Sequence, residues 1–330
     1  MIDQSTKQGR RLSALAIVAA LVVGGRSTVR GQTPQATPPE MPPAVYSVGA
    51  AFDAGRGKLV VFGGYMNGTY VGDTWEWDGK AWHRSAAQGP MARNSPALAY
   101  DAAHRQIVLF GGDTRASGAL GDTWVYDGVA WRQIETPGPP PRTTHQMVYD
   151  SRRHRIVLFG GASGSQMFGD TWEWDGEQWK LVASDGPAAR TLHGLAYDAA
   201  RGRVVLFGGT SVLAPDAPSY GDTWEWDGAR WTQASVTGPS PRDHVSMGYD
   251  ATRGATVMHG GGLGEVDPGQ TWSYDGKKWT RASASGPRRR YAKLVFDDRS
   301  KSMLLYGGFD REPSNELWQL HDATWRRLTP

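Results

Sequence analysis

The sequence predicts an all-β fold made of six similar units, each with four antiparallel strands. Glycine pairs begin at residues 63, 111, 160, 208, 260 and 307, so successive pairs lie 47 to 52 residues apart. All 15 tryptophans lie inside this repeating segment, and each unit has a pair of them seven residues apart. A period of this length is typical of proteins built from repeated supersecondary units.

The third unit shows how the four strands arise. Residues 144–149 form a mixed strand, residues 150–154 a polar turn, and residues 155–159 (RIVLF) an apolar run that ends at a glycine pair. A short apolar run of this kind predicts a strand that is buried on both faces. In residues 171–174 (TWEW) both indoles point to one face, and an Asp-Gly turn then leads into the fourth strand at residues 179–182.

The glycine pairs and the tryptophans indicate how the units pack. Glycine permits a positive φ and a close approach of an aromatic ring to bare backbone, which a side chain would block. A single four-stranded unit cannot bury both of its faces. Six units arranged radially can, because each packs on its neighbours while the large indoles fill the widening space between them.

Residues 44–330 resemble the kelch repeat, whose marks are the Gly-Gly after the second strand and the spaced aromatic residues of the third and fourth strands. The resemblance implies a six-bladed β-propeller whose first strands line a central channel. It also implies that ligands meet the face formed by the second-to-third-strand loops and the links between blades. Kelch proteins include binding modules, oxidases and sugar epimerases, so the fold alone does not determine the function.

The first 43 residues are expected to direct export. Basic Lys7, Arg10 and Arg11 precede an apolar stretch at residues 12–25, which is shorter than a membrane span. We interpret residues 1–31 as a cleaved signal peptide, with an uncleaved anchor or a twin-arginine signal as alternatives. Residues 32–43 are a Pro-rich linker. We therefore expect a periplasmic or extracellular mature chain without a membrane span, and a monomer.

Composition excludes several functions. The formal net charge of +3 is too small to indicate a basic surface for binding nucleic acid, so we expect no nucleic-acid partner. The absence of cysteine excludes disulfides, thiolate metal sites and cysteine nucleophiles, and also the crosslinked cofactor of copper-radical oxidases. We expect no cofactor and no metal.

An arginine begins the innermost strand of five units, at Arg93, Arg142, Arg190, Arg242 and Arg289. One interpretation is a ring of guanidiniums at the channel mouth that holds carboxylate, sulfate or sugar groups. The other is that each arginine bonds carbonyls or carboxylates of a neighbouring blade. His145 and His193 follow their arginines by three residues and His244 is one place out of register, so we predict that the three imidazoles lie just below Arg142, Arg190 and Arg242.

Other acidic residues divide into repeating and unit-specific ones. Asp73, Asp122, Asp170 and Asp222 precede Thr-Trp in four units, and we predict that they cap strand starts or turns. The loop of residues 210–221 is longer than its counterparts, and the next unit carries Glu265 and Asp267. Loops that differ between repeats are places for function, so we expect the specific site between the fourth and sixth units.

The predicted function is a secreted binding or scaffold module that recognises a protein or glycan ligand on its loop face. The alternative is a carbohydrate-active enzyme similar to the periplasmic kelch sialic-acid epimerases, which would need an acid or base beside the arginines. We favour binding because the spacing of residues places no nucleophile–base pair.

Overall fold

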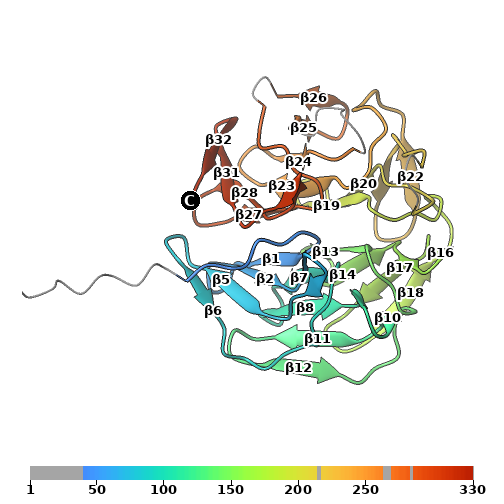
Figure 1. Cartoon of the computed structure of the whole chain (residues 1–330). Coiled ribbons are helices and arrows are strands. Elements are labelled where there is room, and N and C mark those ends of the chain that lie inside the picture. Colours follow the sequence, from blue (N-terminus) through green and yellow to red (C-terminus); the bar gives the residue numbers. More distant parts are fainter. Residues whose placement is uncertain (1–39, 214–216, 263–268, 283–284, 330) are drawn as a thin grey trace, which may run out of the picture. The chain divides into compact units, whose positions relative to one another are not determined.

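The structure is a computed structural model, and it describes residues 40–213, 217–262, 269–282 and 285–329. Pro39–Pro330 form one unit, in which six four-stranded sheets surround a centre as the blades of a propeller (Figure 1). Every strand pair in the blades is antiparallel, and the described residues contain no helix. The predicted six-bladed β-propeller is therefore confirmed. Across those four ranges, there is accordingly no helix of the length and apolarity that crossing a lipid bilayer requires.

Each blade follows the order of the sequence, with its first strand innermost. Blades 1 to 3 consist of β1 (Gly49–Asp53), β2 (Lys58–Phe62), β5 (Thr74–Trp77) and β6 (Trp82–Arg84); β7 (Ala97–Asp101), β8 (Gln106–Phe110), β11 (Thr123–Tyr126) and β12 (Trp131–Ile134); and β13 (Gln146–Asp150), β14 (Arg155–Phe159), β17 (Thr171–Trp174) and β18 (Trp179–Ala183). Blades 4 to 6 consist of β19 (Gly194–Asp198), β20 (Arg203–Phe207), β21 (Thr223–Trp226) and β22 (Trp231–Ala234); β23 (Ser246–Asp250), β24 (Ala255–His259), β25 (Thr271–Tyr274) and β26 (Trp279–Arg281); and β27 (Lys293–Asp297), β28 (Ser302–Tyr306), β31 (Leu317–His321) and β32 (Thr324–Arg327).

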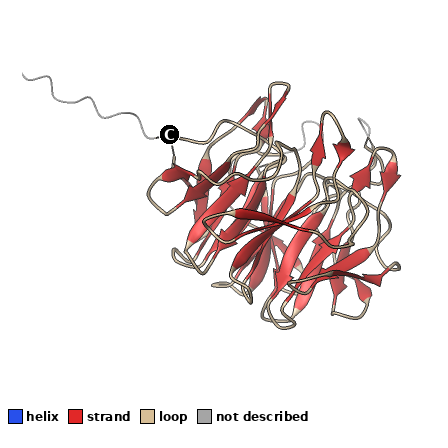
Figure 2. Ribbon diagram, turned by 90° about the horizontal axis from the view of Figure 1, so that it is seen from below, coloured by secondary structure: helices blue, strands red, loops and turns tan. Residues whose placement is uncertain are grey.

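The two ends of the propeller differ. Because successive strands are antiparallel, the links between blades and the second-to-third-strand loops share one end, which we call the loop face. The tight turns that join first to second and third to fourth strands share the other end, the turn face, and both sets of connections are visible in Figure 2. Four loops of the loop face carry short hairpins: β3 (Tyr65–Met66) with β4 (Thr69–Tyr70), β9 (Asp113–Thr114) with β10 (Gly118–Ala119), β15 (Ala162–Ser163) with β16 (Gln166–Met167), and β29 (Phe309–Asp310) with β30 (Glu312–Pro313).

The core lies between the blades. In β14 the side chains from Ile156 to Phe159 are 0% exposed, as the apolar run predicted. Phe159 packs edge-on against Trp231 of the next blade at a centroid distance of 5.2 Å. The Trp231 indole also donates a hydrogen bond of 2.8 Å to Thr171 Oγ1. Contacts of the same kind join blades 1 to 2, 2 to 3 and 4 to 5, so in these blades too the outer tryptophan fastens its blade to the preceding one.

The glycine pairs are required by close approaches of the blade links. Gly160 has a φ of 69°, which favours glycine. A Cβ at this position would lie 2.7 Å from the carbonyl oxygen of Arg190 and 2.9 Å from the His193 ring. The expected positive φ and the expected close approach of an aromatic ring are both confirmed, the ring being the His193 imidazole, and the backbone of the blade link approaches this glycine as well.

Blade 6 closes on blade 1 by packing and not by a shared strand. β32 completes blade 6 by pairing with β31, as predicted. This seam lacks the usual tryptophan bond, since Leu317 stands where other blades have threonine and the buried Trp82 Nε1 has no hydrogen-bond partner. The first described residues support the seam instead: Val45 N–H donates to Ser314 O at 3.2 Å, and Asn315 donates to Pro42 O at 3.0 Å.

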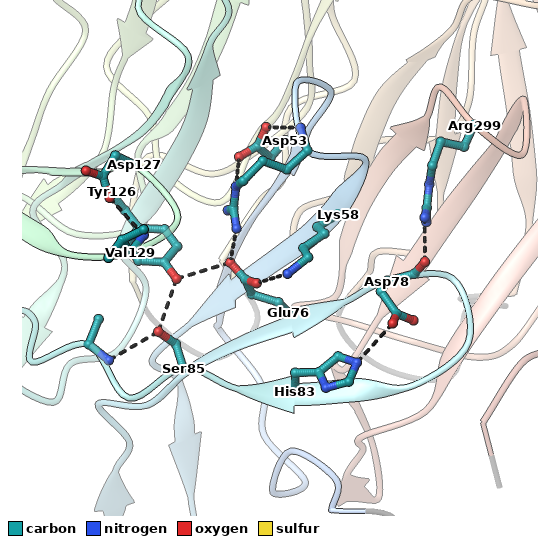
Figure 3. Close-up of polar contacts among 12 residues, drawn as sticks. Asp53, Lys58, Glu76, Asp78, His83, Ser85, Tyr126, Asp127, Val129 and Arg299 are labelled. Atoms are coloured by element: carbon teal, nitrogen blue, oxygen red, sulfur yellow. Dashed lines mark hydrogen bonds and ion pairs between the residues drawn. The ribbon is translucent and has the colours of Figure 1, made fainter.

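Polar networks on the turn face join neighbouring blades (Figure 3). Glu76 of blade 1 accepts hydrogen bonds from Lys58 at 2.5 Å and from the Tyr126 hydroxyl of blade 2 at 3.1 Å. Arg299 of blade 6 donates to the Asp78 carbonyl of blade 1. These side chains are engaged with one another, so the turn face is held together by its own polar groups.

Candidate ligand-binding site

The arginines of the blade links are bound within the protein. Arg142 is 0% exposed, and its guanidinium donates to Asp170 at 2.7 and 2.9 Å, to Gly160 O at 3.0 Å and to Pro140 O at 3.1 Å. It also lies 4.0 Å from the Phe168 ring centroid. Burial opposes ionisation of Asp170, but the bonds and charge of Arg142 outweigh it, so the pKa of this carboxyl is lowered.

The other link arginines follow the same plan. Arg93 pairs with Asp122, Arg190 with Asp222 and Arg289 with Glu316, whereas Arg242 donates to Gln270 at 3.2 Å and to Ser240. None of these arginines lines the channel cavity. The predicted convergence of Arg142, Arg190 and Arg242 at the channel mouth does not occur, because each side chain turns into its own blade toward an acidic or amide group.

The repeating aspartates are therefore structural in a different way from the one predicted. Asp122, Asp170 and Asp222 each receive a bidentate arginine and a tryptophan indole N–H, for example Trp172 to Asp170 at 2.7 Å. Asp73 has no link arginine, since Val45 holds that position in blade 1, and it instead pairs with Arg84 at 2.7 Å. The carboxylates balance the buried charge instead of capping strand starts.

His145 and His193 line the channel cavity, as does His244, but not as a set beneath the arginines. The ring nitrogens of His145 and His193 are buried and have no hydrogen-bond partner among the described residues. Burial, followed by the charge of Arg142, lowers the pKa of His145 well below its usual range. Burial and Arg190 lower the pKa of His193 to about 3. Both imidazoles are therefore neutral at physiological pH.

His244 is bound differently. Its Nδ1 lies 2.7 Å from Oδ1 of the fully buried Asp243, whose Oδ2 accepts a hydrogen bond of 3.1 Å from Ser219 in the long loop. The carboxylate orients the imidazole, and such a pair could serve the acid–base chemistry that the enzymatic alternative requires. Within the described ranges, no group of three or more His, Asp or Glu side chains could hold a metal ion. Glu265 and Asp267 lie outside the described residues.

The central channel contains a cavity of about 430 Å³ between the inner strands. Its mouth on the loop face is a ring of six residues with φ between 50° and 58°: Ser47, Ser95, Thr144, Leu192, His244 and Tyr291. Backbone hydrogen bonds run around this ring, such as Ser95 N–H to Ser47 O at 2.7 Å and His244 N–H to Leu192 O at 2.8 Å. A left-handed backbone is unfavourable for these residue types, so the bonds are needed to hold the ring.

An aromatic cluster lies beside the mouth, over the seam of blades 6 and 1. It consists of Tyr46, Tyr65, Tyr70, Tyr291 and Phe309, all partly exposed. Tyr46 is at its centre, with centroid distances of 5.4 Å to Tyr65, 5.4 Å to Tyr291 and 5.3 Å to Phe309. Tyr65 contacts Tyr70 at 5.5 Å, and Tyr291 contacts the His244 ring at 4.0 Å. The cluster thus extends from the channel mouth onto the hairpin of blade 1.

Asp113 adjoins the aromatic cluster. It accepts hydrogen bonds from the Tyr70 hydroxyl at 3.2 Å and from Thr143 at 3.4 Å. Burial raises the pKa of this carboxyl above its ordinary value, although the hydrogen bonds oppose the shift. A desolvated carboxyl at a surface opening is a frequent mark of a functional site.

These residues were missed by sequence reasoning, although the repeats contain a signal for them. In five of the six blades the residue after the glycine pair forms an isolated β-bridge with a residue of the neighbouring blade link. At most blades these two positions hold small or polar residues, such as Thr191 with Thr210, but at the seam they hold Tyr46 with Tyr65. Lys293 likewise begins an inner strand where Gly49 and Ala97 begin theirs. Comparing the six units position by position would have found these departures.

Comparison with known proteins gives the family. The model of the KLHDC2/KLHL20/DRC7 Kelch-repeats domain matches residues 102–288, which is more than half of the chain. Among solved structures, the structure of YjhT matches with a TM-score of 0.67 at 15% identity, covering 88% of this chain and 99% of that one, a likeness that shows the fold alone. No curated protein matches the chain. The chain belongs to the Kelch-repeat family.

Proposed function

We propose that this Kelch propeller is an exported binding module that recognises a glycan through the aromatic cluster on its loop face. The observation that carries the proposal is the cluster itself. These five rings contact one another beside the channel mouth and remain partly exposed, and none of them belongs to the buried apolar clusters between the blades. Exposed aromatic groups that serve no core mark a binding surface.

The chemistry beside the rings supports a sugar ligand. A sugar presents apolar C–H faces, which can lie on aromatic rings, and hydroxyls that both donate and accept hydrogen bonds. Asp113 is a hydrogen-bond acceptor, and the hydroxyls of Thr143 and of the tyrosines beside it can both donate and accept hydrogen bonds. The adjoining cavity of about 430 Å³ is in the size range of small-ligand pockets. A flat protein partner would use neither the cavity nor so many mixed donors and acceptors.

Export is part of the same proposal. The basic and apolar order of residues 1–31 and the Pro-rich stretch of residues 32–43 support a signal peptide and a linker. The cysteine-free chain needs no oxidising compartment to fold, and glycans are abundant outside the cytoplasm. The proposed site of action is therefore the periplasm or the cell exterior.

A glycan array tests the proposal, followed by titration of the strongest hit. Tyr65→Ala and Tyr70→Ala are each expected to weaken binding about tenfold, roughly 1.4 kcal/mol, because each removes part of the stacking surface. Tyr149→Ala is the matched control, since Tyr149 lies on β13 near the turn face and its hydroxyl accepts from the Ala103 N–H. Equal losses for all three variants, or no bound glycan, would contradict the proposal.

Asp113→Asn should raise stability and weaken glycan binding. Because the folded state raises the pKa of Asp113, ionisation of this carboxyl opposes folding, and the cost is present at every pH above the unfolded pKa of about 4. The amide removes the charge, so we expect a higher urea midpoint at pH 7 and no gain at pH 3. Glycan affinity should fall in the same variant, and a variant with unchanged stability and affinity would show that Asp113 has no role.

A further inference from the structure

One lysine reaches into the channel. Lys293 is the first residue of β27 in blade 6, and its ammonium donates to Gln146 Oε1 at 3.2 Å. Gln146 is the first residue of β13 in blade 3, on the opposite side of the six-bladed ring. The other inner strands begin with uncharged residues, Gly49, Ala97, Gly194 and Ser246. The bond therefore crosses the channel near its loop-face mouth.

The charge of Lys293 has no carboxylate partner within the described part of the chain. Its only ion-pairing candidate among the described cavity-lining residues is Asp298, which lies in the turn after β27 at the far end of the channel. Burial lowers the pKa of Lys293 to about 8, and no nearby carboxylate raises it. Lys293 is only partly exposed inside the channel, and a desolvated cation without a countercharge is costly. An anion bound beside the ammonium would remove that cost.

The neighbouring groups add donors and no opposing charge. His145 and His193 line the same cavity, and burial keeps both neutral. The Gln146 amide accepts from Lys293 and carries two N–H donors of its own. One ammonium and one amide suit a ligand with a single negative charge and two acceptor oxygens, whereas a phosphate dianion would leave an unbalanced negative charge in the channel.

We propose that the channel binds a small monocarboxylate anion between Lys293 and Gln146. The anion neutralises the ammonium and accepts hydrogen bonds from both side chains. The anion site differs from the proposed glycan surface in its binding groups, since neither Lys293 nor Gln146 belongs to the aromatic cluster, although Tyr291 of that cluster lines the same cavity.

The probe is ¹³C-labelled acetate, with line broadening measured by NMR at constant ionic strength. We expect saturable binding to the full chain at pH 7, competed by unlabelled formate and not by chloride or inorganic phosphate. Lys293→Met should reduce the affinity at least tenfold and should fold well, because it removes a half-buried charge that has no carboxylate partner among the described residues. Gln146→Glu should also abolish binding, since the new carboxylate pairs with Lys293 and takes the place of the ligand. Lys180→Met, an exposed lysine on β18, is the control.

Acetate affinity measured at a series of pH values gives a second test, which uses the wild-type protein and does not depend on whether a variant folds. Binding should weaken as the pH rises through 8, because the neutral amine no longer attracts the anion. The other titratable groups that line the channel are His145, His193, His244, Tyr291 and Asp298, together with Tyr100, Tyr149, Tyr197 and Tyr249. His321→Gln, a change at an exposed histidine outside the channel lining, should leave the profile unchanged. The proposal would be overturned if acetate showed no saturable binding, or if Lys293→Met bound acetate as well as the wild type does. It would also be overturned if the protein preferred phosphate to acetate, or if the affinity for acetate did not change between pH 7 and pH 9. A missing glycan hit would leave this result unaffected.

Discussion

Replacing Arg190 by Ala is expected to destabilise the propeller by about 3–5 kcal/mol and to leave ligand binding unchanged. The guanidinium is 1% exposed and donates to Asp222 at 2.6 and 2.9 Å and to Gly208 O at 3.1 Å. Removing one partner of a buried ion pair leaves the other charge uncompensated, which is the main source of the loss. Urea unfolding of the variant and the wild type measures the effect.

The Asp222 partner and an exposed arginine complete this experiment. Arg190→Met combined with Asp222→Leu should cost less than the sum of the two single changes, because the pair then leaves no lone buried charge. Arg132→Ala should be nearly neutral, since Arg132 is exposed on β12. A stable Arg190→Ala variant that had lost ligand binding would restore the ring of guanidiniums as the ligand site.

Acid is expected to destabilise the protein through two buried histidines. The folded state lowers the pKa of His145 and lowers that of His193 to about 3, whereas both are about 6.5 in the unfolded chain. A depressed histidine pKa means that the unfolded chain binds more protons, so this stability is fully present above pH 6.5 and is lost as the pH falls. Each such group contributes up to about 1.4 kcal/mol per pH unit below the unfolded pKa, so the two together give a slope of at most about 2.7 kcal/mol per pH unit as the pH falls below 6.

The free energy of unfolding, measured in urea at successive pH values, tests this slope. His145→Leu and His193→Leu should each remove about half of it, whatever their effect on stability at pH 7. His321→Gln serves as the control because His321 is exposed. Below pH 4 the paired carboxylates also titrate, so the comparison belongs above that value. A wild-type slope that the two leucine variants did not reduce would contradict the assignment of neutral buried imidazoles.

The blades could be predicted because their signals are local and repeated. The apolar run at residues 155–159 and the two indoles at residues 171–174 each fix a strand by a pattern within a few residues, and six copies exclude coincidence. The radial packing follows from the unburied faces of such units. Even the closure of blade 6 on blade 1 follows, since each unit already contains four strands.

The site could be predicted only in part, because its side chains meet through contacts that local patterns do not record. Arg142 and Asp170 lie 28 residues apart, and both were identified, but their pairing depends on the direction in which the link turns. Lys293 and Gln146 are 147 residues apart and meet across the channel. Each of these two residues departs from the repeat in one unit only, so a consensus sequence of the six units does not show it. The loop face was predicted as the ligand surface and the site between the fourth and sixth units, whereas the aromatic cluster that we propose as the site lies over the seam of blades 6 and 1.

Hydrogen–deuterium exchange in the presence of the best-binding glycan tests the central claim most directly. If the ligand occupies the aromatic cluster at the channel mouth, the amides of residues 46–47, 65–70 and 290–293 should gain protection. The Asp-Gly turns of the turn face, at residues 78–81 and 127–130, should exchange as in the free protein. Protection confined to those turns, with none at the aromatic cluster, would contradict this account of the Kelch propeller.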